Sequence, residues 1–212
     1  MSQTRSPGGN ALPRKNDQLK RCVNLSAVIL LTSTLLVLGG CGKSAGGNAV
    51  HVKSATTGEK DLAIRSGYAF PVTKSFTDIN NKITTASAYY VYLANYDLDA
   101  KNFAMTLDKP LTADDQVRMV FSLIGDEGTN DQSPLKAATY SAKADKYGKA
   151  ESAGIVTRKN GADVKSWLDR SMLTGEVKVT SATAEEISGD VNLSSGDTSI
   201  KGSFTAKILK RK

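Results

Sequence analysis

Carboxylates supply most of the reactive side chains of this sequence, and the densest group of them lies in one predicted loop. Asp126, Glu127, Asn130 and Asp131 fall within six residues, directly after an alternating apolar segment. Hard cations such as Ca²⁺ bind oxygen ligands that loops of this kind present. The order of these residues, however, departs from the alternating Asp-x-Asp-x-Asp-Gly pattern of calcium loops. Asp126, Glu127 and Asp131 are therefore only weak candidates for metal ligands, and we predict a solvated loop without a metal.

Other carboxylates leave open a hydrolase that works with paired acids. Glycoside hydrolysis needs two carboxyl groups that face each other about 5–9 Å apart. The sequence shows closely spaced acids but not their separation in space: Asp97 and Asp99, then Asp114 and Asp115. A carboxylate-dependent hydrolase is therefore kept as an alternative function.

Histidine and cysteine are too scarce for most other catalytic sites. His51 is the only histidine, and it falls in a segment predicted to be flexible. A catalytic imidazole needs a rigid scaffold, which such a segment does not provide. Cys22 and Cys41 are the only cysteines, too few to complete a zinc cluster with one histidine. We therefore predict that the protein is not an enzyme and uses no cofactor.

Aromatic residues are the remaining candidates for a binding surface. Those in or beside apolar segments either pack as core or line a groove for a sugar or a peptide. Seven residues belong to this group: Tyr68, Phe70, Tyr89, Tyr90, Tyr92, Tyr96 and Trp167. A deep groove lined by tyrosine and tryptophan would favour a binding module over a hydrolase.

Alternating apolar and polar residues predict the strands that must position these side chains. The alternation begins near Asp61 and recurs to the C-terminus, with no long helical pattern. Pro71 is expected to end the first strand, and residues 88–94, apolar on both faces, are expected to be central in the sheet. Asn160-Gly161 predicts a tight hairpin turn, and Phe121 is expected in the core. We predict an all-β domain, an antiparallel β-sandwich or barrel of about seven or eight strands.

The C-terminal hairpin can be placed in register from the sequence alone. Its loop contains Gly196 and Asp197, and apolar residues alternate on both sides of it. The alternation predicts three pairs: Leu193 with Ile200, Val191 with Gly202, and Gly189 with Phe204. Because an aromatic ring is known to cover a glycine across a strand pair, we expect Phe204 to lie over Gly189.

The N-terminal part has the organisation of a secretory signal peptide. Lys20 and Arg21 precede the apolar residues 25–40, and small residues follow. This segment runs into Leu38-Gly39-Gly40-Cys41, which resembles the lipobox of bacterial lipoproteins. The resemblance implies that a diacylglyceryl group is attached to the Cys41 sulfur and that the chain is cut before Cys41. A retained transmembrane helix is the alternative, but residues 25–40 would span only about 24 Å, less than the ~30 Å hydrocarbon core.

This resemblance divides the chain into three parts. Residues 1–40 are the signal peptide, residues 41–58 are the lipidated cysteine and a flexible Gly/Ser/Ala-rich tether, and residues 59–212 are a single all-β domain. The lipid on Cys41 would hold the protein to a membrane of the cell envelope. In the resembling family, a residue other than aspartate after the cysteine, here Gly42, favours the outer membrane. In a host with two membranes, the domain would then face the periplasm or the cell surface.

The net charge of +7 does not indicate a partner made of nucleic acid. Residues 1–40 contain five cations and one anion, so the remainder carries only +3. No nucleic-acid-binding motif is recognisable. We therefore predict an envelope lipoprotein whose β domain serves in binding or structural support, with an envelope protein or a glycan as its partner. A small-ligand or glycan-binding module is the first alternative, and the carboxylate-dependent hydrolase is the second.

Overall fold

The alternating segments form β-strands, and their apolar side chains point into one shared interior. The computed structural model describes residues 48–102, 107 and 109–209, which belong to one compact unit. Eleven strands occur in these residues: β1 (Ala49–Ser54), β2 (Gly58–Ala63), β3 (Ser66–Thr77), β4 (Ile83–Ala94), β5 (Val117–Glu127), β6 (Thr139–Ser141), β7 (Lys149–Lys159), β8 (Ala162–Trp167), β9 (Thr174–Ala182), β10 (Glu186–Ser195) and β11 (Thr198–Ile208). The described part of the chain contains no helix with the length and apolar character that crossing a membrane requires.

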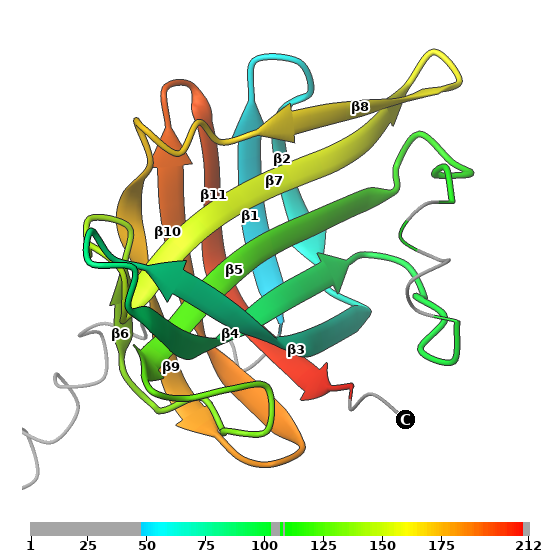
Figure 1. The fold of residues 1–212 in the computed structure, drawn as a ribbon. Helices are drawn as coiled ribbons and strands as arrows, with labels where there is room; N and C mark the ends of the chain where they lie inside the picture. The colour runs from blue at the N-terminus through cyan, green and yellow to red at the C-terminus, as the bar shows by residue number, and fades with distance from the viewer. Residues whose placement is uncertain (1–47, 103–106, 108, 210–212) are drawn as a thin grey trace, which may run out of the picture. The chain divides into compact units, whose positions relative to one another are not determined.

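Eight of these strands close into a barrel (Figure 1). They are hydrogen-bonded in the order β10-β9-β6-β7-β5-β4-β3-β11, and β11 pairs again with β10. Outside this ring, β1 and β2 extend the sheet from β11, and β8 pairs with β7. The prediction of an all-β, barrel-like domain is confirmed. It is wrong in two details, because three further strands join the sheet and because β3–β11 and β6–β7 pair in parallel.

The first two strands correct the predicted start of the domain. β1 pairs with both β2 and β11, and its Val50 and Val52 are buried. Two valines among small and polar neighbours make an alternation too short to distinguish from the composition of a linker. The predicted tether, residues 41–58, is therefore wrong from residue 49 onward. Its residues 41–47 lie outside the described part of the chain, as do the signal peptide and Cys41.

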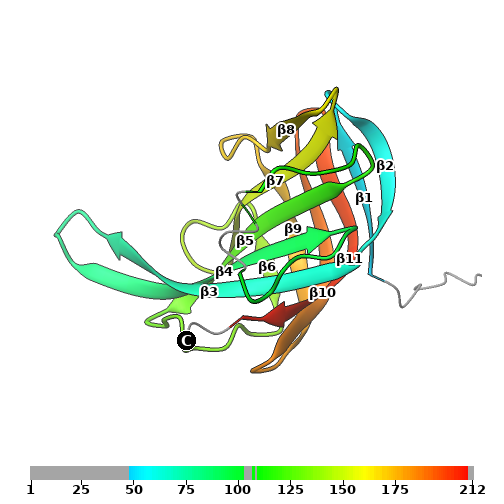
Figure 2. The same ribbon diagram turned by 90° about the vertical axis from the view of Figure 1, so that its right-hand side faces the viewer.

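Pro71 lies inside β3 and does not end it, contrary to the prediction. It pairs with Tyr89 of β4, and β3 continues for six more residues. Proline has no N–H to donate, so within a sheet it needs an edge that no other strand occupies. The second edge of β3 pairs with β11 only at Tyr68 and Ala69, and Pro71 lies two residues beyond this pairing. Beyond this point the β3–β4 hairpin extends away from the barrel (Figure 2).

The barrel interior is packed around two phenylalanines from different strands. Phe121 of β5 and Phe204 of β11 are 0% and 1% exposed, and their ring centroids lie 5.1 Å apart. The rings meet edge to face at 76°, an arrangement that aromatic pairs prefer. The predicted core position of Phe121 is confirmed.

The predicted register of the C-terminal hairpin is also confirmed, and its glycine lies against the backbone of a third strand. Gly189 pairs with Phe204, and the other two predicted pairs are present as well. A Cβ at Gly189 would lie 2.0 Å from the carbonyl oxygen of Lys178 in β9, beside an irregularity in the β9–β10 pairing. The close approach of this backbone accounts for the glycine.

Barrel closure depends on a second close approach, at Gly67 of β3. A Cβ there would lie 2.0 Å from the carbonyl oxygen of Thr205 in β11, a backbone atom that cannot rotate away. We expect Gly67→Ala to lower the free energy of unfolding by about 1–3 kcal/mol, the usual cost of overpacking. Urea denaturation measures this loss. Ala63→Val, which adds carbon at an exposed position of β2, should keep the parental midpoint. A parental midpoint for Gly67→Ala would contradict this account of closure.

Candidate ligand-binding site

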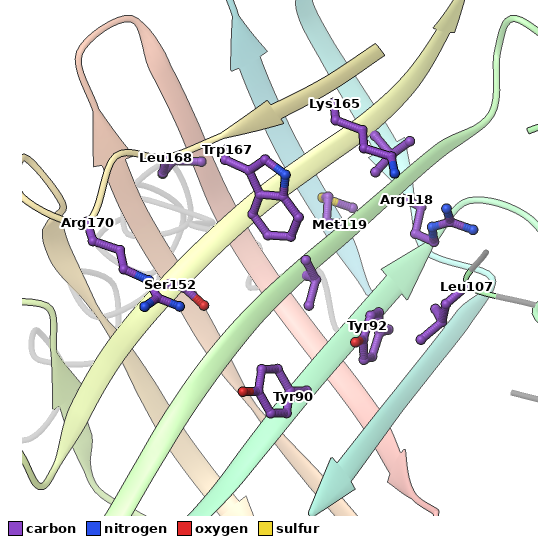
Figure 3. A pocket seen from close by; sticks show the side chains of 12 residues that line it. Tyr90, Tyr92, Leu107, Arg118, Met119, Ser152, Lys165, Trp167, Leu168 and Arg170 are labelled. Atoms are coloured by element: carbon purple, nitrogen blue, oxygen red, sulfur yellow. The ribbon is translucent and has the colours of Figure 1, made fainter. Parts of the chain in front are cut away.

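A cavity of about 530 Å³ lies on the outer face of the barrel, over β4, β5, β7 and β8 (Figure 3). Its tyrosines, Tyr90 and Tyr92, alternate along β4 with Val91 and Leu93, which face the core. The strand that is apolar on both faces thus uses one face for the core and the other for the cavity. Sites for small molecules have volumes of about 300–1,000 Å³, so the cavity is large enough for one sugar residue or a few.

The cavity arises from one row of side chains that crosses four strands. Tyr92 pairs with Val120, Val120 with Gly154, and Gly154 with Trp167. Residues that pair across adjacent strands project from the same face of a sheet. Because the row has an aromatic residue at each end and only valine and glycine between them, its centre is hollow.

Trp167 forms one wall of the cavity because Gly154 has no side chain. A Cβ at residue 154 would lie 2.5, 2.7 and 3.0 Å from three atoms of the indole. The ring therefore rests directly on the backbone of β7, while the residue as a whole remains 61% exposed. An indole supported on one side in this way offers its other side to a flat or apolar group.

Three cations surround this indole. In Figure 3, Trp167 lies between Arg170 at one end and Lys165 and Arg118 at the other. Arg118 is only 6% exposed, and its Nη1 donates to the hydroxyl of Tyr96 at 3.3 Å. Burial raises the pKa of the Tyr96 phenol, although the nearby Arg118 lowers it. The phenol is therefore neutral at physiological pH and does not cancel the positive charge.

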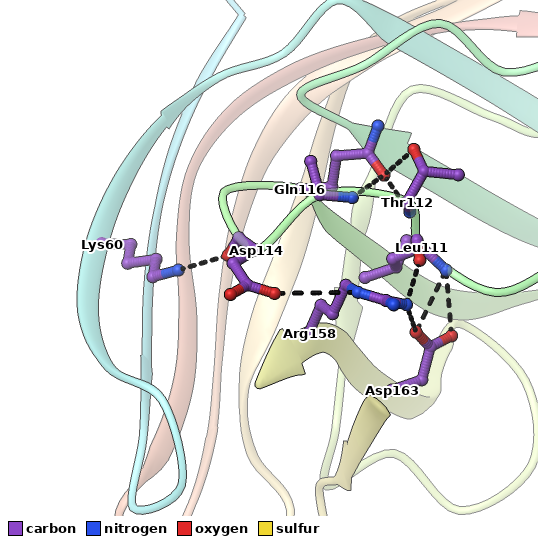
Figure 4. A network of polar contacts seen from close by, with 8 residues as sticks. Lys60, Leu111, Thr112, Asp114, Gln116, Arg158 and Asp163 are labelled. Atoms are coloured by element: carbon purple, nitrogen blue, oxygen red, sulfur yellow. Dashed lines mark hydrogen bonds and ion pairs between the residues drawn. The ribbon is translucent and has the colours of Figure 1, made fainter. Parts of the chain in front are cut away.

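A polar network fixes the hairpin that carries Lys165 and Trp167 (Figure 4). The carboxylate of Asp163 accepts a hydrogen bond from the Leu111 amide, with N–O distances of 3.0 and 3.2 Å. Arg158 lies 3.8 Å from the same carboxylate and donates to the Leu111 carbonyl. This clamp joins β7 and β8 to the loop that precedes β5, and so holds one side of the cavity in place.

The candidate metal ligands do not form a site. Asp126 makes an ion pair with Lys136 at 2.5 Å, and Asp131 accepts a hydrogen bond from Thr73 at 3.2 Å. Glu127 ends β5 and faces solvent. Within the described ranges, no group of three or more His, Cys, Asp or Glu side chains is placed to hold a metal ion.

Three of the four carboxylates considered for a hydrolase, those of Asp97, Asp99 and Asp114, make other contacts, and Asp114 lies 3.7 Å from Arg158. Asp97 accepts from Arg65 at 2.9 Å. Hydrogen bonds from the Asn102 side chain and from nearby backbone amides hold the pKa of Asp99 below its ordinary value. A general acid needs a pKa near the working pH, so Asp99 is poorly suited to that role. The cavity itself has no aspartate or glutamate among its described lining residues.

His51 belongs to β1 and not to a flexible segment, which corrects the prediction. Its Nδ1 lies 2.8 Å from Oδ1 of Asp61, the residue opposite it on β2. Both side chains are accessible to solvent. A cross-strand pair of this kind contributes about 0.2–1 kcal/mol to sheet stability, which accounts for the contact without catalysis.

Three of the seven aromatic candidates line the cavity, namely Tyr90, Tyr92 and Trp167. The other four do not, and Tyr89, for example, is buried and donates to the Ser133 carbonyl. Sequence reasoning did not find the contributions of Gly154 or of the three cations. The signal for Gly154 was present, because counting outward from the confirmed Asn160-Gly161 turn places it opposite Trp167.

Comparison with known proteins provides no relative from which to assign this site. The chain matches no protein family, no curated protein and no solved structure. Its function must be inferred from the geometry described above.

Proposed function

We propose that this chain is a lipid-anchored protein of the cell envelope whose β domain binds a small ligand or a glycan and performs no catalysis. The row from Tyr92 to Trp167 carries the proposal, because it places two aromatic walls around a hollow on a rigid sheet. The resemblance of Leu38-Gly39-Gly40-Cys41 to a lipobox supports the anchor.

The cavity is better suited to binding a sugar ring than to catalysing a reaction. The C–H face of a sugar packs on an aromatic ring, while its hydroxyl groups need donors and acceptors at the edge of the site. Trp167 supplies the ring, and the hydroxyls of Tyr90 and Ser152 lie at the border of the cavity (Figure 3). The described lining contains no carboxylate that could act as an acid or a nucleophile, so the hydrolase alternative receives no support here.

Replacing the exposed indole should weaken binding and leave the fold intact. Trp167 is the only tryptophan, so a change in intrinsic fluorescence during titration with saccharides reports directly on the cavity. We expect Trp167→Ala to weaken binding, measured by calorimetry, about tenfold or more, since truncating an aromatic anchor commonly costs ~2 kcal/mol. Because the residue is 61% exposed, the melting temperature should change little.

Two further variants separate loss of the indole from general damage. Trp167→Phe keeps a flat ring and should retain part of the affinity. Gly154→Ala keeps the indole but displaces it from the backbone of β7, and should therefore weaken binding as well. Parental affinity in both Trp167→Ala and Gly154→Ala would refute binding at this cavity.

A further inference from the structure

The charges around the cavity indicate the chemical class of the ligand. Lys165 and Arg170 are exposed and lie on opposite sides of the Trp167 indole, and Arg118 adds a third, buried positive charge (Figure 3). Among the described residues, neither Lys165 nor Arg170 takes part in an ion pair. The two cations that flank the aromatic wall are thus available to a ligand.

The acids of the neighbouring strands do not neutralise this surface. Glu151 of β7 makes an ion pair with Lys74 of the β3–β4 hairpin. Asp163 of β8 accepts from the Leu111 amide and lies near Arg158 (Figure 4). Both carboxylates are held by partners outside the cavity, so neither of them pairs with Lys165 or Arg170.

We propose that the cavity selects acidic saccharides, in which a sugar ring packs on Trp167 while its carboxylate, sulfate or phosphate group meets Lys165 or Arg170. This inference rests on the proposed function and specifies its ligand. Arginine and lysine are the side chains that bind such anions with charge-assisted hydrogen bonds. A neutral sugar would leave the positive charge unmatched, and charge complementarity of this kind gives selectivity between similar ligands.

The test compares neutral saccharides with their acidic derivatives. The mature lipidated protein, in a neutral detergent, is applied to an array that carries each neutral glycan beside its carboxylated, sulfated and phosphorylated forms. We expect the acidic member of a pair to bind at least tenfold more tightly, and this advantage to shrink as salt is raised and charges are screened. The array also shows which anionic group is preferred.

The charge variants make the test specific to this cavity. The double variant Lys165→Gln/Arg170→Gln should lose the preference for acidic saccharides while it keeps the parental melting temperature. Lys178→Gln, at an exposed position of β9, is the matched control and should retain the full preference. An unchanged preference in the double variant would overturn the inference.

The remaining outcomes distinguish the preference for acidic saccharides from the proposed binding function on which it rests. Equal binding of neutral and acidic members, with loss of both in Trp167→Ala, would overturn the acidic preference and support a binding module. No binding of any saccharide, with unchanged Trp167 fluorescence, would overturn both proposals.

Discussion

Phe121→Ala is expected to lower the free energy of unfolding by about 3–5 kcal/mol, the usual cost of truncating a buried phenylalanine. Phe121 is fully buried at the centre of the barrel, and its ring packs edge to face against Phe204. The surrounding strands are joined in a closed ring, so they cannot collapse freely into the resulting cavity. Small domains are stable by only about 5–15 kcal/mol, so this change alone removes a large part of the total stability. Urea denaturation at room temperature should show a much lower unfolding midpoint.

Another aromatic pair, Phe76 with Tyr147, provides the control. Phe76 packs edge to face against Tyr147 at 5.4 Å, but it is only partly buried and lies on the protruding hairpin. Phe76→Ala should therefore cost much less than Phe121→Ala. Equal losses for the two variants, or a parental unfolding midpoint for Phe121→Ala, would show that the interior does not stabilise the domain as described.

Cys41→Ser is expected to move the protein from the membrane fraction to the soluble fraction. The expectation rests on the lipobox resemblance, since Cys41 lies outside the described residues. Each buried methylene of an acyl chain contributes ~0.8 kcal/mol, and stable anchoring takes two chains or an equivalent second signal. Without the thiol no diacylglyceryl group is attached, so the whole contribution is lost. Fractionation of cells and incorporation of labelled palmitate measure the two effects.

The other cysteine of the chain is the matched control for this experiment. Cys22 precedes the apolar segment, so Cys22→Ser should remain in the membrane fraction and should still incorporate the label. If Cys41→Ser also remained there, residues 25–40 would act as a retained span, and the proposed lipid anchor would be abandoned.

The sequence by itself determined the all-β class, most of the strands, the tight turns and the pairing of the C-terminal hairpin. Alternation places Leu193 and Val191 on one face, and a tight turn then aligns them with Ile200 and Gly202. The predicted hairpin turn at Asn160-Gly161 is likewise present. These features are local, because the side-chain period of a strand and the geometry of a turn depend only on residues close in sequence.

Where a position depends on a distant neighbour, local patterns were insufficient. Pro71 has the signature of a strand end, yet it lies within β3 because β11 leaves that edge free after Ala69. The alternation around Val50 is too short to stand out, yet it forms a strand because β11 offers an edge on which to pair.

Only the tertiary structure decided how the barrel closes and where the cavity lies. Closure joins β3 to β11 at Gly67, where the lack of a side chain lets the two backbones meet. The cavity joins Tyr92 of β4 to Trp167 of β8 through two other strands. Which distant strands become neighbours depends on the free energy of packing the whole interior. No local pattern in the sequence contains that information, so the aromatic candidates were visible beforehand but their common site was not.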